Sequence, residues 1–321
     1  MSSLAACPPH PHGTHESRAH HAPGRLGTGH RRRPVIPAAA IREKATGNLQ
    51  HPRFSNGEVA RALGGPVWHL GSGTFGDTWR HGNAAVKILC GQPVEDARLQ
   101  REVAGLSRVC SPYVVRLDST GMVDLGGREF HALVFEYIEG ADVEERLRRG
   151  DQPSAAEVQA FLRGLLSGVG HLHETTTVHR DIKPANIVLR GDDWGSPVLI
   201  DLGLARADGE STITLFGGPV GTYNYMAPEV LLGQAQRPAG DLFAVGVTVR
   251  QVLGGQHPFY DGTERSLAEM ARKVGKGPRP LSAGVPVHVA EVLDRLTHRQ
   301  KAPRGSAFSC LQQLGGEGAA A

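Results

Sequence analysis

A polar run between two short apolar segments in the middle of the chain places the strongest constraint on its fold. Residues 179–186 read His-Arg-Asp-Ile-Lys-Pro-Ala-Asn, and the apolar triplet Ile187–Leu189 follows directly. A second triplet, Val198–Ile200, is followed by Asp201, which lies twenty residues after Asp181 (201 − 181). Short apolar runs bounded by turn residues are typical of buried strands. The spacing therefore predicts a hairpin that brings these polar side chains close together.

These polar residue types suit phosphoryl transfer. That reaction needs carboxylate and amide oxygens for Mg²⁺, a base near the acceptor hydroxyl, and cations against the phosphates. Asp181, Lys183, Asn186 and Asp201 supply groups of each kind.

A glycine-rich segment lies earlier in the chain, at residues 71–76 (Gly-Ser-Gly-Thr-Phe-Gly). Glycines let a backbone approach phosphates and offer N–H donors to them. The pattern is weak alone, because the chain holds 42 glycines. A Rossmann loop needs a helix after the glycines, whereas residues 77–80 read as a strand, and the Gly-Lys-Ser/Thr ending of a P-loop is missing. A hairpin lid over a nucleotide is favoured.

Lys87 lies in an apolar strand, Ala84–Leu89. A surface lysine whose stem packs on apolar neighbours would explain it equally well by itself. The expected helix at 94–109 carries Glu102, fifteen residues on (102 − 87). Glu102 could anchor Lys87, which would then hold the α and β phosphates.

Apolar periodicity divides the chain into parts. Residues 1–60 are rich in Pro, His, Gly and Arg, which predicts a disordered basic tail. Strands are expected at 67–70, 77–80, 84–89, 114–119 and 131–136. Helices are expected at 155–173, 241–253 and 286–296. Residues 317–321 are expected to form a flexible end.

The tail leaves alternatives open. Six histidines in the first 30 residues could bind metal, although a solvated tail with adventitious metal affinity explains them more simply; they are His10, His12, His15, His20, His21 and His30. Its arginines are typical of a transit peptide, but the prolines and glycines break the amphipathic helix that such a peptide needs.

Composition and charge exclude several classes. Hydrophobic residues make up 40% of the chain, an ordinary globular share. No stretch approaches the 18 consecutive apolar residues that a membrane-spanning helix needs. The net charge of +3 does not favour nucleic acid as a partner. The tail lacks the apolar core of a signal peptide. We expect a cytoplasmic protein that binds neither membranes nor nucleic acid.

In this order, the motifs resemble those of the eukaryotic-type (Hanks-type) protein kinases of the serine/threonine class, over residues 64–316. The resemblance extends to the hinge (Val134–Gly140), the end of the activation segment (Gly221–Glu229) and the buried-aspartate motif of a helix (Asp241–Gly246). It implies a two-lobed α+β protein kinase fold, with a β-rich N-lobe (64–138) and a larger α-helical C-lobe (139–316). ATP would bind between the lobes. The Ala/Gly/Arg-rich composition is typical of a bacterial member.

The resemblance implies a role for each matching residue. Asp181 matches the catalytic base, and Lys183 matches the lysine that neutralises the γ-phosphate in Ser/Thr kinases. Asn186 and Asp201 match the ligands of Mg²⁺, or Mn²⁺. Lys87 and Glu102 match the ion pair that marks the active state, while Phe135 is in the gatekeeper position. The residues implied to bind the nucleotide are Leu70, Gly71, Ser72, Gly73, Gly76, Thr78, Ala85, Lys87, Glu136, Ile138, Asp142 and Val188. Of these, the backbones of Glu136 and Ile138 would bind adenine, Ala85 and Val188 would sandwich it, and Asp142 would meet the ribose.

The resemblance also bears on regulation and partners. Arg180 is expected to bind a phosphate placed by autophosphorylation, in a transient homodimer, on the activation-segment candidates Ser211, Thr212 and Thr214. Protein substrates are the expected partners, and Thr222 would contact Asp181 and Lys183. Glu229 would form a structural ion pair with Arg304, and His179 would be a packed core residue.

The departures from the family pattern remove no charge needed for chemistry. Leu202 stands for the usual Phe, Thr78 for the usual Val, and Phe243 for the usual Trp. Three alternatives stay open: a pseudokinase or scaffold with the same fold, a small-molecule kinase of related fold, and a tail that binds metal or an acidic partner as the functional part. The retained Lys87, Asp181 and Asp201 argue against the first, and Lys183 with the Gly221–Glu229 segment argues against the second.

Overall fold

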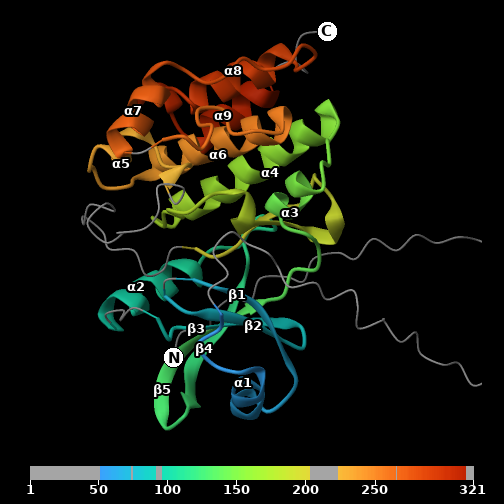
Figure 1. Cartoon of the computed structure of the whole chain (residues 1–321). Coiled ribbons are helices and arrows are strands. Elements are labelled where there is room, and N and C mark those ends of the chain that lie inside the picture. The colour runs from blue at the N-terminus through green and yellow to red at the C-terminus, as the bar shows by residue number, and fades with distance from the viewer. Residues whose placement is uncertain (1–50, 74, 92–95, 203–222, 265, 316–321) are drawn as a thin grey trace, which may run out of the picture.

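The computed structural model describes residues 51–73, 75–91, 96–202, 223–264 and 266–315. A lobe built on an antiparallel sheet and a lobe built of helices are joined by the segment that follows strand β5 (Figure 1). The expected two-lobed α+β fold is confirmed.

Five strands form the sheet of the first lobe. They are β1 (Val67–Ser72), β2 (Asp77–His81), β3 (Ala84–Ile88), β4 (Leu117–Leu125) and β5 (Arg128–Glu136), in the order β1-β2-β3-β5-β4. Each expected strand is present, but the one expected at 114–119 is β4, which begins at Leu117 and runs on to Leu125. Val114 instead bridges to Leu199 in the helical lobe.

The register of β2 and β3 decides which face of the sheet each side chain serves. Trp79 pairs with Val86, and both are buried in a cluster with Val59 of helix α1 (Asn56–Leu63). Thr78 pairs with Lys87. Because side chains alternate along a strand, Thr78 and Lys87 point to the opposite face, toward the helical lobe.

The predicted tail is wrong for residues 51–60, because this stretch contains most of helix α1. Ser55 and Glu58 form a reciprocal capping box at its start, and Gly64 ends it in the left-handed conformation (φ 75°). Val59 is fully buried against the sheet. In Figure 1 α1 covers the end of the β-rich lobe that is remote from the helical lobe. Residues 1–50 lie outside the described residues.

Helix α2 (Asp96–Leu106) flanks the sheet, within the helix expected at 94–109. The second lobe holds α3 (Val143–Arg148), α4 (Ala155–Glu174), the hairpin β6 (Ile187–Leu189) and β7 (Pro197–Leu199), α5 (Pro228–Leu231), α6 (Pro238–Gly254), α7 (Leu267–Gly275), α8 (Val287–Leu296) and α9 (Ala307–Gly315). The helices expected at 155–173, 241–253 and 286–296 are α4, α6 and α8.

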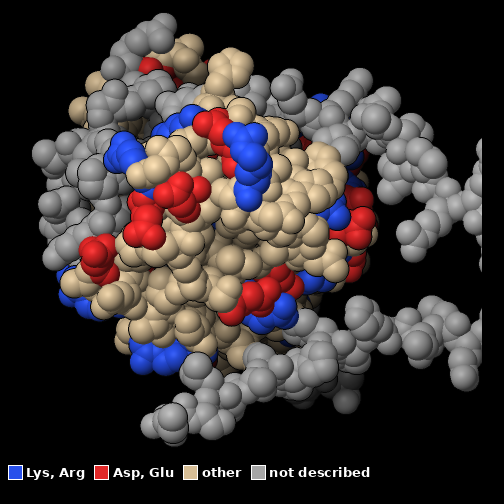
Figure 2. Space-filling view, turned by 90° about the horizontal axis from the view of Figure 1, so that it is seen from below, with Lys and Arg blue, Asp and Glu red and all other residues tan. Residues whose placement is uncertain are grey.

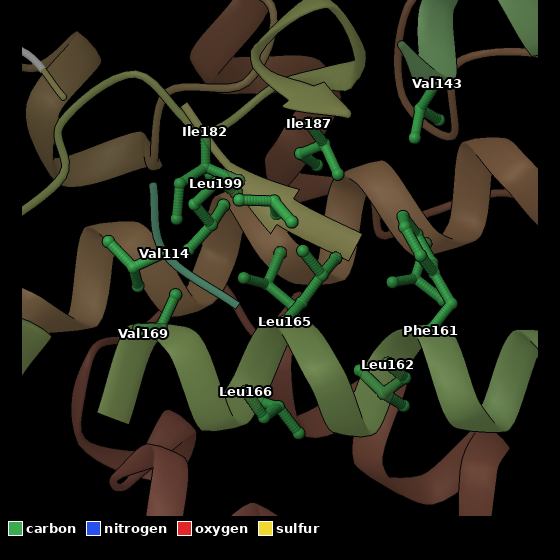
Figure 3. Close-up of a cluster of buried hydrophobic side chains, with 14 of the residues drawn as sticks. Val114, Val143, Phe161, Leu162, Leu165, Leu166, Val169, Ile182, Ile187 and Leu199 are labelled. Carbon is green, nitrogen blue, oxygen red and sulfur yellow. The ribbon is translucent and has the colours of Figure 1, made fainter. Parts of the chain in front are cut away.

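A continuous apolar layer lies between α4 and the β6–β7 hairpin. Phe161, Leu165 and Val169 project from α4 toward Ile187 and Leu199 of the hairpin (Figure 3), and all five side chains are fully buried. Each buried side chain of this size stabilises the fold by about 1.5–3 kcal/mol. The layer fixes the position of the polar loop that precedes β6.

Charges of both signs alternate on the outer end of the β-rich lobe (Figure 2).

Among the described residues, no helix combines the length and apolar character needed to cross a bilayer.

Candidate active site

The loop before β6 brings together three of the predicted catalytic and metal-binding residues. Asn186 donates from Nδ2 to the carbonyl oxygen of Asp181 at 2.8 Å and to its Oδ2 at 2.9 Å. Lys183 Nζ lies 3.0 Å from Asp181 Oδ2. The Asp181 carboxylate is therefore held in one orientation, with a cation beside it.

A buried aspartate on α6 shapes the backbone of this loop. Asp241 is completely buried and accepts hydrogen bonds from the N–H groups of His179 (2.8 Å) and Arg180 (2.9 Å). Arg180 has a φ of 70°, a left-handed conformation that is uncommon for a residue with a side chain. The two hydrogen bonds stabilise this conformation just before Asp181.

The histidines around Asp241 complete its environment. His173 Nε2 lies 3.0 Å from Asp241 Oδ2. Burial by itself raises the pKa of Asp241, but the hydrogen bond and charge of His173, aided by His179 and the Arg180 N–H, lower it below its ordinary value. His179 is fully buried, and its Nδ1 accepts from the Asp181 N–H at 3.3 Å. The prediction of a packed core histidine is confirmed.

Lys87 of β3 joins the β-rich lobe to the helical lobe. Its Nζ forms a salt bridge with Oδ1 of Asp201, which follows β7. Asp201 also has a left-handed backbone (φ 55°). A predicted phosphate-binding lysine and a predicted metal ligand are thus direct neighbours.

Glu102 of α2 has a different partner from the one expected. Arg180 donates from a guanidinium N–H to Glu102 Oε1 at 2.9 Å, with both side chains largely enclosed. Lys87 contacts Asp201 instead. The expected Lys87–Glu102 pair is therefore wrong for this conformation, because each partner is engaged by another charge of the described site.

The glycine-rich segment forms a tight turn between β1 and β2. Gly73 N–H donates to the Gly76 carbonyl at 2.9 Å. A Cβ added at Gly76 would lie 1.9 Å from the carbonyl oxygen of Ile88, so only glycine fits there. Leu70, Gly71 and Ser72 form the end of β1, while Thr74 lies outside the described residues.

The residues expected to surround adenine lie in the segment between the lobes and on the strands beside it. Phe135 and Ile138 are buried, and Ala85 pairs with Phe135 across the sheet. The side chain of Glu136 accepts from the Arg116 N–H at 3.1 Å and lies 3.3 Å from a guanidinium nitrogen of Arg190. These contacts fix the first residue of the connection.

Asp142 and Val188 are close neighbours where the connecting segment enters the helical lobe. They form an isolated β-bridge, which places the predicted ribose residue beside the predicted adenine residue. Asp142 is buried and also caps α3, with Oδ1 accepting from the Glu145 N–H at 2.8 Å.

Beyond the loop, the predicted Glu229–Arg304 pair is confirmed. The guanidinium donates to both carboxylate oxygens, at 2.7 Å and 3.0 Å. The predictions for Ser211, Thr212, Thr214 and Thr222 fall on residues 203–222, which lie outside the described residues.

Some residues around the site escaped the sequence analysis. Arg53 and Asp77 form a salt bridge at 2.6 Å beside the glycine-rich turn. Tyr225 donates to Gln251 Oε1 of α6 at 2.7 Å, and His257 bonds to the Asn224 carbonyl. The capping box at Ser55 could have predicted helix α1, which begins just after Arg53. The contacts of Tyr225 and His257 join residues far apart in the sequence.

A two-lobed fold with this loop, this glycine-rich turn and this connection is the fold of the protein kinase class. The family model described as the protein kinase domain matches residues 67–314. The chain belongs to this family.

Curated relatives agree with that assignment. The chain is 30% identical over 238 residues to serine/threonine-protein kinase PknD of Mycobacterium tuberculosis, covering 71% of this chain and 34% of the relative. It is 37% identical over 202 residues to human ribosomal protein S6 kinase alpha-4, covering 60% of this chain and 25% of the relative. The expected serine/threonine class agrees with the name of the mycobacterial relative. The chain spans about a third or less of the length of these relatives.

A solved structure shares the fold. It is titled as the crystal structure of Rad53 1-466 in complex with AMP-PNP, with a TM-score of 0.60 and 22% identity, and the match covers 77% of this chain and 63% of that one.

Proposed function

We propose that the protein is an ATP-dependent serine/threonine protein kinase that transfers the γ-phosphate to hydroxyl groups of protein substrates. The observation that carries the proposal is the Asp181 carboxylate, held by Asn186 Nδ2 at 2.9 Å and paired with Lys183 at 3.0 Å. Such groups suit a reaction whose catalysis is mainly positioning and electrostatics. The resemblance to PknD and to ribosomal protein S6 kinase alpha-4 supports it.

Each described residue has a place in this reaction. Asp181 orients the acceptor hydroxyl and accepts its proton. Lys183, whose Nζ lies 3.0 Å from that carboxylate, neutralises charge on the γ-phosphate as it is transferred. Lys87 holds the other phosphates once it exchanges Asp201 for the nucleotide.

The donor set fits Mg²⁺. Asn186 uses Nδ2 toward Asp181, which leaves its carbonyl oxygen as a ligand, and Asp201 offers a carboxylate. Hard oxygens of this kind suit Mg²⁺, and phosphate oxygens and waters would supply the other ligands. The bound metal would neutralise phosphate charge in the transition state.

The ion pairs of this conformation suggest how activity is switched. Arg180 binds Glu102, and Lys87 binds Asp201. A phosphate on Ser211, Thr212 or Thr214, placed by autophosphorylation in a transient homodimer, would carry a charge of about −2 and compete with Glu102 for Arg180. Glu102 would then be released toward Lys87. The homodimer and a cytoplasmic location stay predictions.

Asp181→Asn tests the proposed function. We expect phosphate transfer from ATP to a generic protein acceptor to fall by at least about 100-fold, because a positioned base contributes roughly that much. Asp118→Asn is the control, since Asp118 lies on the surface paired with Arg116. Its activity should equal that of the wild type.

The outcomes separate the alternatives. Transfer by the wild type no faster than by Asp181→Asn would indicate a pseudokinase or scaffold. Transfer to free sugars or other small molecules, and to no protein, would indicate a small-molecule kinase. Phosphosite mapping of the wild type would locate phosphate on Ser211, Thr212 or Thr214 if autophosphorylation operates.

A further inference from the structure

The segment that precedes the kinase domain contacts the glycine-rich turn through Arg53. The family match begins at residue 67, so Arg53 and helix α1 (Asn56–Leu63) stand before it. Three hydrogen bonds start from Arg53. Its N–H donates to Asp77 Oδ2 at 2.7 Å, and its guanidinium donates to Asp77 Oδ1 at 2.6 Å and to the Gly73 carbonyl at 2.9 Å.

Asp77 needs this partner. It follows Gly76 directly, and its side chain is completely buried. Asp77 and Trp79 are two residues apart on β2, so their side chains point to the same face of the sheet. This is the face that α1 covers. A buried carboxylate is stable only when it is paired and hydrogen-bonded. The cation comes from Arg53, 24 residues earlier in the chain.

Arg53 is itself held in place. The next residue, Phe54, packs edge-on against Phe130 of β5 with ring centroids 5.4 Å apart. Ser55 then caps α1, and Val59 of that helix is fully buried against the sheet. The guanidinium therefore projects from a rigid support, and its side chain is only 28% exposed.

The contact to Gly73 links this support to the lid over the nucleotide site. Gly73 is also tied to Gly76 by the N–H to carbonyl bond at 2.9 Å, and the Phe75 carbonyl accepts from the Gly91 N–H at 3.0 Å. Arg53 holds the outer side of the turn, away from the face that carries Lys87.

We propose that Arg53 is a positioning residue for the nucleotide, which fixes the glycine-rich lid from outside the kinase domain through Asp77 and the Gly73 carbonyl. The inference rests on the proposed kinase function. A lid ordered before binding loses less conformational freedom when it closes on ATP. Releasing Arg53 should therefore weaken nucleotide binding and leave the phosphate-transfer step nearly unchanged.

The test uses the full chain and two changes. Arg53→Lys keeps a cation opposite Asp77 but lacks the two separate guanidinium nitrogens with which Arg53 bonds Asp77 and Gly73. The double variant Arg53→Ala/Asp77→Ala removes the buried charge as well, so that no unpaired carboxylate is left to unfold the lobe. Arg61→Ala is the control, because Arg61 lies exposed in the last turn of the same helix.

We expect the Kd for AMP-PNP and the KM for ATP to rise about 5- to 10-fold in both variants, as for loss of one hydrogen bond of ordinary strength. The kcat at saturating ATP and the KM for the protein substrate should change less than about twofold, as in loss of uniform binding. Amide hydrogen exchange across residues 71–76, measured without nucleotide, should accelerate. Arg61→Ala should match the wild type in every measurement.

Other outcomes overturn the inference. A folded double variant with wild-type Kd for AMP-PNP and wild-type exchange at residues 71–76 would show that Arg53 only neutralises Asp77. Equal losses in kcat and in the KM for both substrates would indicate general damage to the lobe. If the wild type binds AMP-PNP but transfers no phosphate, the proposed function fails while the exchange and binding results still decide the role of Arg53.

Discussion

At the scale of single residues, Glu229 and Arg304 show how distant charges stabilise the helical lobe. Arg304 is fully buried, and besides Glu229 it donates to the carbonyls of Ala239 and His298, each at 2.9 Å. Its guanidinium also lies 4.8 Å from the ring centre of Phe243. The cation therefore has a partner on several sides, which a buried charge requires.

Removing this cation should destabilise the protein strongly. Arg304→Ala leaves the buried Glu229 carboxylate unpaired, so we expect the free energy of unfolding to fall by about 3–5 kcal/mol. Urea unfolding followed by circular dichroism measures it. Arg149→Ala is the control, since Arg149 forms an exposed pair with Glu145 that should contribute under about 0.5 kcal/mol. Equal losses in the two variants would contradict the role of the buried pair.

Gly76 is a residue whose identity is set by space. A Cβ there would lie 1.9 Å from the Ile88 carbonyl oxygen, so backbone must shift. Gly76→Ala should destabilise the β-rich lobe by about 1–3 kcal/mol, and should raise the KM for ATP because the lid is displaced. Gly121→Ala on β4 has open space around the new methyl group and serves as the control in thermal unfolding and kinetics. A wild-type KM for Gly76→Ala would refute the steric argument.

At the scale of elements, the loop after α6 supports the end of the activation segment. His257 Nδ1 accepts from the N–H groups of Phe259 (3.2 Å) and Tyr260 (3.1 Å). The opposite nitrogen, Nε2, must then carry the proton that it donates to the Asn224 carbonyl at 3.0 Å. The ring also stacks on Tyr260, with centroids 4.6 Å apart. These contacts require a neutral imidazole.

This arrangement predicts a loss of stability in mild acid. Burial lowers the pKa of His257 from 6.5 to about 4. Between these values the unfolded chain binds the proton and the folded chain does not, so stability falls as the pH drops through this range. At pH 5.5, His257 should lower the free energy of unfolding by roughly 1 kcal/mol relative to pH 7.5. Urea unfolding at pH 7.5 and pH 5.5 should show a smaller pH effect for His257→Gln than for the wild type; an identical pH effect would exclude His257 as the cause.

At the scale of the whole molecule, the lobes meet through backbone and charge. The Val115 N–H donates to the Leu199 carbonyl, and the Leu199 N–H donates to the Tyr113 carbonyl, both at 2.9 Å. The pairs Lys87–Asp201 and Arg180–Glu102 join the lobes beside this bridge. A ligand between the lobes should therefore stabilise them as one unit.

AMP-PNP with Mg²⁺ should raise the free energy of unfolding by about 2.7 kcal/mol at a ligand concentration of 100 times its Kd. Chelation of the metal with EDTA should remove most of this stabilisation, because Asn186 and Asp201 then bind no cation between themselves and the phosphates. Thermal unfolding measures the effect. Asp201→Asn should respond to AMP-PNP equally with and without Mg²⁺; full stabilisation of the wild type in EDTA would contradict the proposed metal site.

Local patterns in the sequence determined the loop, the lid and the main elements. The helical spacing of α4 and the apolar triplets of β6 and β7 were readable because each element buries a periodic face of its own. Asp181, Lys183 and Asn186 lie within six residues, so their proximity follows from one turn of chain. Helix α1 was not predicted, because the Pro, His, Gly and Arg content of residues 1–60 favoured a disordered tail over the capping box at Ser55 and Glu58.

Only the tertiary structure decided which charges meet. Lys87 lies 114 residues from Asp201, and Arg180 lies 78 residues from Glu102. Both alternatives, Glu102 with Lys87 or Glu102 with Arg180, satisfy the same local pattern, and the position of α2 relative to the helical lobe selects between them. The pairing of Arg53 with Asp77 likewise could not be predicted from the sequence, because it depends on which face of β2 is covered by α1. Sequence thus determined the chemistry available to this protein, and packing across long separations decided which of its charged groups are engaged with one another.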